Sequence, residues 1–249
     1  RAVNASKDDE IHSYTLPEGA TLYVAPRHTL PIVAARIAFL GGSLAESPQQ
    51  AGLTSFMASM WTRGTLSHPS APSFASATED LAADISGFSG RSSEGLSLEV
   101  TRENWLSGLN LMTEVLNEPL FDAEEFATEH RETLAAIERR EDQLAHQAFL
   151  LFARNHYQQH PYRLPLLGER ESVESFTVED IRNHHNRLIR SPNLVMAVAG
   201  DVDPDETAEL VTSRLASLPG APFATSHCFL PRVDPAGLPV SAEFPVAPA

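Results

Sequence analysis

The histidines are the first candidates for a metal-binding or catalytic site in this sequence. His156 and His160 lie four residues apart, a spacing that can place two imidazoles on one helix face, where they can bind a metal ion such as zinc. They straddle the end of a predicted helix just before Pro161, and no third ligand lies nearby, so the pattern favours no metal site. The adjacent His184 and His185 point in different directions on a predicted helix, and we expect a solvated face there.

Serines and carboxylates are the other candidate reactive groups. Ser55 and Ser59 could act as nucleophiles, but neither a Ser-x-x-Lys motif nor a nucleophile-elbow motif surrounds them. We therefore expect them to be small packing residues. The acidic helix from Glu124 to Asp142 is expected to be a solvated face, and a groove for basic peptides is the alternative.

The helix that carries the two serines is strongly patterned. In the stretch GLTSFMASMWTRGT, apolar residues recur at i, i+3, i+4, i+7 and i+8, which is typical of a helix with one buried face. These residues are Leu53, Phe56, Met57, Met60 and Trp61. A second face carries Ser55, Ala58 and Ser59, whose small side chains are almost unreactive.

Composition narrows the class of protein. The 249 residues are 42% hydrophobic and 20% charged, as is usual for a globular protein. The net charge of −15 repels phosphate backbones, so we expect no nucleic-acid partner. The single cysteine, Cys228, excludes an internal disulfide and a thiolate cluster for zinc. No apolar run reaches about 18 residues, which predicts no membrane span.

The pattern along the chain predicts an α+β fold. Strands are predicted at 21–25 and 32–40, as a pair within 86–101, and at 193–202. Helices are predicted at 52–65, 72–85, 103–118, 122–143, 145–157, 177–189 and 204–220, with Ser73, Asp122 and Thr177 as N-caps. Because strands and helices mix without strict βαβ alternation, we expect a mostly antiparallel sheet packed against helices on one side.

The ends of the chain differ from its middle. Residues 1–11 are predicted to be a polar N-terminal extension, and residues 12–220 a single domain. Residues 221–249 are rich in proline, a composition typical of a linker or tail toward a further domain. The sequence does not start with Met, so we expect a processed chain or a piece of a longer one.

Several segments together resemble the insulinase/pitrilysin family of zinc peptidases, the inverzincins, which include the mitochondrial processing peptidases. The stretch FLGGSLAESPQQAGLTSFMASMWTRGT matches the family frame at Gly42, Ser43, Glu46, Gly52, Leu53, Met60, Gly64 and Thr65. FDAEEFATEHRETLAAI, HPYRLPLLGERESVESFTVEDI and NLVMAVAGDVDPDE follow in the family's order. The resemblance covers residues 12–220 and implies the fold of an insulinase-type peptidase domain.

The resemblance also locates the residues that this chain lacks. Family members bind zinc through two histidines in H-x-x-E-H and a glutamate on a later helix, and the glutamate of the motif is the general base. The matching positions here are Ser55, Ala58, Ser59 and Ala136. Serine is a poor zinc ligand and alanine is none. The resemblance therefore implies no catalytic residue, no bound metal and no zinc cofactor, although Glu129 remains from a residue that supports the ligands in the family.

One further segment has a counterpart near the family's active site. In the family this segment is a strand to which substrate can add as another strand, and backbone pairing needs no catalytic side chain. The matching residues are Ser86, Gly87, Phe88, Ser89, Gly90, Arg91 and Ser92. A peptide-binding edge and a plain hairpin turn are both compatible with the sequence.

The resemblance leaves three functions open. The first is a non-catalytic insulinase-family domain that pairs with a catalytic domain or subunit, which can belong to the same longer polypeptide, and helps to enclose peptide substrate. The second is an active hydrolase with a different centre, for which we find no well-spaced set of residues. The third is a free-standing binding or scaffold protein. The family's bacterial members are often extracytoplasmic, which hints at a periplasmic location, but the sequence leaves the compartment open.

Overall fold

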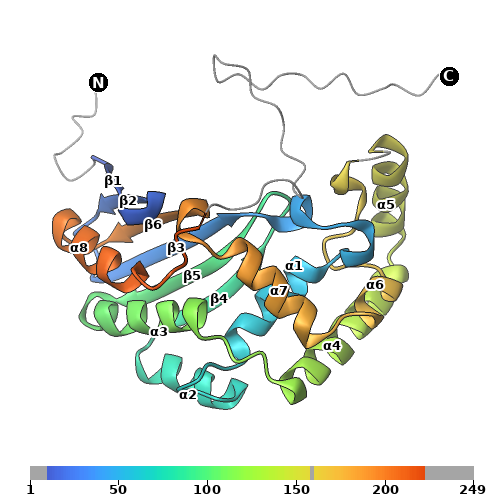
Figure 1. Ribbon diagram of the computed structural model, residues 1–249, viewed down its shortest axis with the longest axis horizontal. Helices are drawn as coiled ribbons and strands as arrows, with labels where there is room; N and C mark the ends of the chain where they lie inside the picture. Colours follow the sequence, from blue (N-terminus) through green and yellow to red (C-terminus); the bar gives the residue numbers. More distant parts are fainter. Residues whose placement is uncertain (1–9, 158–159, 222–249) are drawn as a thin grey trace.

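One mixed sheet organises the computed structural model, which describes residues 10–157 and 160–221 (Figure 1). Its strand order is β1-β2-β6-β3-β5-β4. Neighbouring strands pair in antiparallel fashion except β2 and β6, which are parallel. The strands are β1 (His12–Thr15), β2 (Thr21–Pro26), β3 (Ile32–Leu40), β4 (Asp84–Ser89), β5 (Ser93–Thr101) and β6 (Leu194–Gly200). The predicted α+β class with a mostly antiparallel sheet is confirmed.

The helices lie largely on one side of this sheet (Figure 1). They are α1 (Leu53–Met60), α2 (Ala71–Asp80), α3 (Trp105–Asn117), α4 (Ala123–Glu141), α5 (Leu144–His156), α6 (Arg170–Glu174), α7 (Val178–Leu188) and α8 (Pro204–Leu215). α1 packs on β4 and β5, α3 on β5, and α8 on β2. The N-caps predicted at Asp122 and Thr177 are present, since both side chains accept hydrogen bonds from amides of the first helical turn.

The strands alternate between a covered face and a bare one. In β3 the buried residues are Val33, Ala35, Ile37 and Phe39, whereas the residues between them are exposed or half-buried. β6 shows the same alternation. This period of two is that of a sheet with helices on one face only.

The core forms around α1 as its pattern predicts. The apolar residues of α1 and the Trp61 that directly follows it are at most 2% exposed; they are Leu53, Phe56, Met57, Met60 and Trp61. They belong to the same buried cluster as the inward residues of β3 and β6.

The predicted helix 72–85 is wrong at both ends. α2 begins one residue after Ser70, whose hydroxyl accepts a hydrogen bond from the Ser73 amide at 3.3 Å, so Ser70 and not Ser73 is the N-cap. The helix stops at Asp80, Ala82 adopts a left-handed conformation (φ 47°), and β4 begins at Asp84. Pairing of β4 with β5 overrides the helical pattern there, an effect of tertiary structure on local propensity.

Two predicted end segments fall almost entirely outside the described residues. The N-terminal extension, 1–11, is described only at residues 10 and 11, and the linker, 221–249, only at residue 221. Within the described part of the chain, no helix combines the length and the apolar character needed to cross a membrane.

The close contact between β4 and α1 at Gly87 predicts a large effect of adding one methyl group. A Cβ at Gly87 of β4 would lie 2.0 Å from the Ala58 carbonyl oxygen of α1, whereas a Cβ at Gly90 would meet nothing nearer than 3.4 Å. We expect Gly87→Ala to lower the free energy of unfolding by about 1–3 kcal/mol, because backbone must move to admit the methyl group. Gly90→Ala is the control and should change it by less than about 1 kcal/mol. Urea unfolding of both variants measures this, and equal stabilities would contradict the contact.

Candidate functional site

The start of α1 is held by a buried carboxylate. Gly52, the N-cap of α1, has a left-handed conformation (φ 92°) and no side chain to cap the helix. The side chain of Glu46 caps the helix instead. Its Oε1 accepts a hydrogen bond from the Thr54 amide at 2.8 Å, and its Oε2 accepts one from the Gly52 amide at 3.1 Å. Burial raises the pKa of Glu46 to about 6, and the hydrogen bonds from Thr54 and Gly52 oppose this rise.

The three positions that match H-x-x-E-H lie on α1 in different surroundings. Ser59 is exposed and donates its hydroxyl to the Ser55 carbonyl oxygen at 3.3 Å, and Ser55 is half-buried. The expectation that both serines pack is therefore wrong for Ser59. Ala58 is 4% exposed, and its carbonyl lies against Gly87 of β4.

The fourth position, Ala136, lies on α4, which packs against α1. The rings of Phe56 on α1 and Phe126 on α4 are 5.2 Å apart. The two helices to which the resemblance assigns the ligands therefore face each other. Ala136 itself is half-buried.

Zinc does not fit the residues present at these positions. Two hydroxyls and two methyl groups are a donor set that zinc does not favour, because it prefers imidazole, thiolate and carboxylate ligands. Among residues 10–157 and 160–221, no group of three or more His, Cys, Asp or Glu side chains is arranged to hold a metal ion. We therefore derive no chemical step through a metal.

Glu129, which the resemblance leaves with no metal ligand to support, is paired with an arginine. It is 7% exposed, and its Oε2 accepts from Arg63 Nη2 at 2.5 Å while its Oε1 accepts from Thr133 at 3.1 Å. Arg63 also bonds Glu132 at 2.5 Å and Glu125 at 3.5 Å. The acidic helix is thus not simply a solvated face, because one arginine from the helical turn that follows α1 pairs with three of its carboxylates. The spacing of the acidic residues along α4 does not predict that they pair with Arg63.

The predicted peptide-binding segment forms β4 and the turn that follows it. β4 is the last strand of the sheet, so within the described residues its outer edge pairs with no other strand. Phe88 turns to the bare face, where the Arg36 guanidinium lies 3.7 Å from its ring centroid. Arg91 in the turn donates to the Leu164 carbonyl at 2.7 Å. The edge strand thus lies beside α1.

Comparison with known proteins places this geometry in a family. The model of the insulinase family, peptidase family M16, matches residues 23–170, and that of the peptidase M16 inactive domain matches residues 175–246. The chain belongs to the insulinase family. The recognised resemblance is thereby confirmed.

Two curated relatives and one solved structure illustrate the similarity. An uncharacterized zinc protease of Rickettsia felis is 25% identical over 71% of this chain and 43% of its own length. A non-peptidase homologue, YmxG of Helicobacter pylori, is 24% identical over 77% of this chain and 44% of its own. A peptidase M16 inactive domain from Pseudomonas fluorescens shares the fold, with a TM-score of 0.81, 22% identity, and coverage of 86% of this chain and 52% of that one. This insulinase-family chain thus spans less than half the length of these two curated relatives.

The histidine pair of α7 is buried in this insulinase-family chain, so the predicted solvated face is wrong. His184 is 3% exposed; its Nε2 lies 3.2 Å from the Thr54 hydroxyl and 3.5 Å from Glu94, and its Nδ1 accepts from Arg187 at 3.1 Å. His185 is 9% exposed, and its Nε2 donates to the Leu116 carbonyl at 3.0 Å. Both side chains contact residues that are distant in the sequence. The pattern of residues along a helix cannot predict such contacts.

The other histidine pair forms no metal site among the described residues. His160 Nδ1 accepts a hydrogen bond from the Tyr162 amide at 3.2 Å, so this side chain caps a short helical turn. The His156 ring stacks on Phe152 at a centroid distance of 5.3 Å.

The buried His185 predicts a pH dependence of stability. Burial lowers the pKa of His185 from 6.5 to about 4, because the apolar site disfavours the charged ring. The stability it contributes is complete above pH 6.5 and is lost as the pH falls toward 4. His185→Gln retains a donor for Leu116 but cannot titrate, so its stability relative to the native chain should rise by about 2–3 kcal/mol between pH 7 and pH 4.5.

Urea unfolding of both proteins across that pH range measures the difference. Glu46 acts in the opposite sense, because its raised pKa, about 6, makes its contribution disappear as the pH rises from 4.5 through 6. It is present in both proteins, so it cancels in the comparison. A constant stability difference from pH 7 to pH 4.5 would contradict the assignment to His185.

Proposed function

We propose that this chain is a non-catalytic domain of the insulinase family that pairs with a catalytic domain or subunit and helps to enclose peptide substrate. The domain comprises residues 12–220 and holds no zinc. The enclosing partner carries the H-x-x-E-H motif, either in another subunit or in the same longer polypeptide.

The proposal rests on an insulinase-family arrangement of helices and strand that lacks the residues assigned to the family's zinc chemistry. α1, α4 and the edge strand β4 are packed together, whereas the four positions assigned to the ligands and the general base are Ser55, Ala58, Ser59 and Ala136. Arg63 further supports the proposal. It pairs with the carboxylate of Glu129, which would otherwise be buried without an opposite charge once the metal site is absent.

Peptide binding is proposed at the outer edge of β4. An extended peptide can add to an unpaired edge through main-chain hydrogen bonds alone, and neighbouring side chains then select residues at alternate positions. Among residues 10–157 and 160–221 no strand pairs with this edge, and the ring of Phe88 and the charge of Arg91 lie beside it.

The alternative function, a free-standing binding protein, differs in the partner it requires. The proposed role predicts co-purification with an insulinase-family protein that carries an intact H-x-x-E-H motif. A native protein that consistently purifies without one favours the alternative.

Zinc binding tests the assignment of the ligand positions. After dialysis against a buffer that contains zinc, the purified chain should hold far less than one zinc ion per molecule, as measured by elemental analysis. Ser55→His and Ser59→His combined with Ala136→Glu should bind zinc at least about tenfold more tightly than the two histidine substitutions alone. Ala58 is left unchanged because it is buried against β4 and zinc binding does not need the general base.

Competition with a chromophoric chelator measures both affinities. If Glu at 136 adds no affinity, α4 does not present this position to α1, and the ligand assignment fails. Stoichiometric zinc in the unmodified chain would overturn the non-catalytic assignment.

Hydrogen exchange tests the edge strand. Adding an unstructured peptide, such as the oxidised B chain of insulin, should slow amide exchange in β4 (Asp84–Ser89) by at least about threefold at saturation, because outward amides acquire partners. The opposite edge of the sheet, β1 (His12–Thr15), is the internal control and should not change. Protection of β1 alone, or of neither edge, would contradict the proposed site.

A further inference from the structure

The carboxyl group of Glu94 lies in the apolar interior. Glu94 is the second residue of β5, and the next inward-facing residues of that strand, Leu96, Leu98 and Val100, belong to the core. Its side chain is 0% exposed. Neither carboxyl oxygen has a hydrogen-bond partner among the described residues. A carboxylate buried without donors is strongly disfavoured, so the group must be neutralised or paired.

The nearby polar group that can pair with it is the ring of His184 on α7. The Nε2 of His184 is 3.5 Å from Glu94 Oε2, and on the other oxygen a Cβ added at Gly41 would lie 2.5 Å from Oε1. The same Nε2 is 3.2 Å from the Thr54 hydroxyl, which donates to the Gly42 carbonyl at 3.3 Å and therefore accepts from the ring. Thr54 thus competes for the one N–H that points toward the carboxyl group. We call Glu94 and His184 the buried pair.

The second ring nitrogen of His184 is occupied by an arginine. A guanidinium can only donate, so Nδ1 accepts the 3.1 Å hydrogen bond from Arg187 and carries no proton. The ring then holds one proton, at Nε2, and is neutral. An imidazolium ion beside Glu94 would require Arg187 to leave Nδ1. Arg187 is also held by the Ala45 carbonyl at 2.8 Å.

The elements around the buried pair add few other charges. In the described part of the chain, the charged groups that face it are Glu46, from the segment before α1, and Arg187 on α7. His185, the next residue of α7, donates to a carbonyl of α3 and is neutral because burial lowers its pKa to about 4. α1 itself carries no titratable side chain. Arg36 of β3 and Arg91 before β5 bind elsewhere, to a ring and to a carbonyl.

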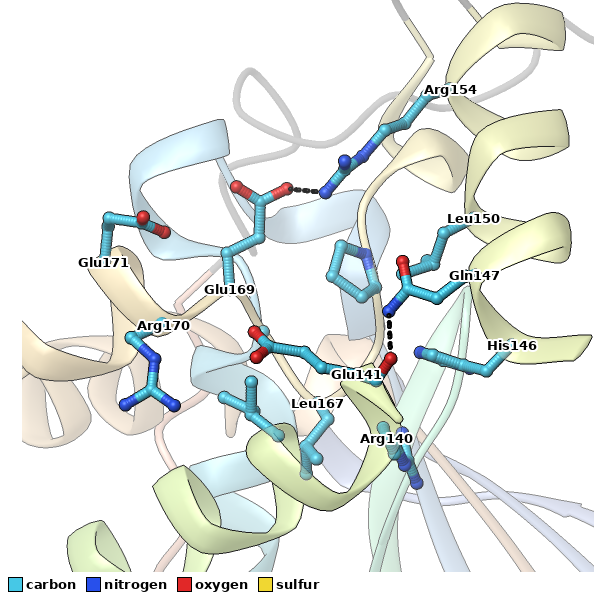
Figure 2. A pocket seen from close by; sticks show the side chains of 13 residues that line it. Arg140, Glu141, His146, Gln147, Leu150, Arg154, Leu167, Glu169, Arg170 and Glu171 are labelled. Carbon is cyan, nitrogen blue, oxygen red and sulfur yellow. Dashed lines mark hydrogen bonds and ion pairs between the residues drawn. The ribbon is translucent and has the colours of Figure 1, made fainter. Parts of the chain in front are cut away.

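The pocket between α4, α5 and residues 165–171 shows the contrast that burial makes (Figure 2). Arg154 and Glu169 form an ion pair there at 3.0 Å, with side chains that are 54% and 37% exposed. Water solvates both charges, so neither group has to be neutral. Glu94 has no such access to water, and no arginine pairs with it among residues 10–157 and 160–221.

We propose that the buried pair binds one additional proton in the folded chain above neutral pH, and that this proton keeps α7 attached to β5 and to the start of α1. Two carboxyl groups, Glu94 and Glu46, share the single cation Arg187, and the proton removes the charge that would otherwise be unbalanced. While Arg187 occupies Nδ1, the proton lies on the Glu94 carboxyl group. Its loss at high pH creates a buried charge that α7 must move aside to hydrate. This inference does not depend on the proposed function.

The proton is linked to stability within a defined range of pH. In an unfolded chain glutamate titrates at about pH 4.3 and histidine at about pH 6.5, so the unfolded pair holds one proton between these values and none above them. The two groups titrate together in the folded chain, where the pair keeps its proton above pH 6.5. Folding therefore takes up a proton there, and stability falls as the pH rises.

Urea unfolding from pH 7 to pH 9 tests this linkage. The unfolding equilibrium constant of the unmodified chain should rise at least about tenfold, because one proton bound only in the folded chain contributes up to about tenfold per pH unit. Glu94→Gln has no carboxyl group to protonate and should abolish the rise. Glu99→Gln is the matched control, because Glu99 lies on the exposed face of the same strand, and it should retain the rise.

Infrared spectroscopy detects the proton in the unmodified chain. At pH 8 the carbonyl stretching band of a protonated carboxyl group should be present in this chain and in Glu99→Gln, and missing from Glu94→Gln. Exposed carboxyl groups are ionised at this pH, and so is Glu46, whose pKa is about 6. Circular dichroism checks that each variant is folded.

Amide hydrogen exchange measures the effect on α7 (Val178–Leu188). From pH 7 to pH 9 its protection should fall at least about tenfold in the unmodified chain and stay nearly constant in Glu94→Gln, after correction for the intrinsic exchange rates.

Three results would overturn the inference. The first is the absence of the protonated carboxyl band at pH 8 in the unmodified chain, which requires no variant to fold. The second is an equal pH dependence of stability in Glu94→Gln and the unmodified chain. The third is an unchanged protection of α7, which would show that the proton does not hold this helix.

Discussion

The carboxylate of Glu46 fixes the helix on which the rest of the structure depends. α1 begins at a glycine with no capping side chain, so its first amides need an acceptor from elsewhere. Glu46 supplies both oxygens from a buried position just after β3. With its start held, α1 brings Ala58 against Gly87 of β4 and Arg63 against α4. The desolvation that raises the pKa of Glu46 is the cost of this internal cap.

The arrangement of α1, α4 and β4 persists without the groups that give the family its zinc chemistry. Apolar packing maintains it, as in the contact between Phe56 and Phe126, and packing does not require a metal. Glu129 remains buried and needs an opposite charge, which Arg63 provides. The packing of these elements therefore does not depend on a metal ion.

The hairpin of β4 and β5 carries features of two kinds. The edge of β4, where we propose that an extended peptide adds, presents backbone groups of an outermost strand. Glu94 of β5 faces the core instead, where it meets His184 of α7. Since Glu94 is fully buried, a peptide bound at the edge makes no contact with its side chain.

The sequence by itself determined the features that depend on near neighbours. The spacing from Leu53 to Trp61 specified the buried face of α1, and Asp122 and Thr177 specified helix starts. The residue types at positions 55, 58, 59 and 136 are the basis of the proposal that the chain holds no zinc. Tertiary structure decided which polar groups are buried and which apolar ones are not. Thr54 meets His184 across 130 positions, and Arg63 meets Glu129 across 66. Helical periodicity reports only neighbours three or four residues away, so it could reveal neither these partners nor the exposed leucines and phenylalanines of α5.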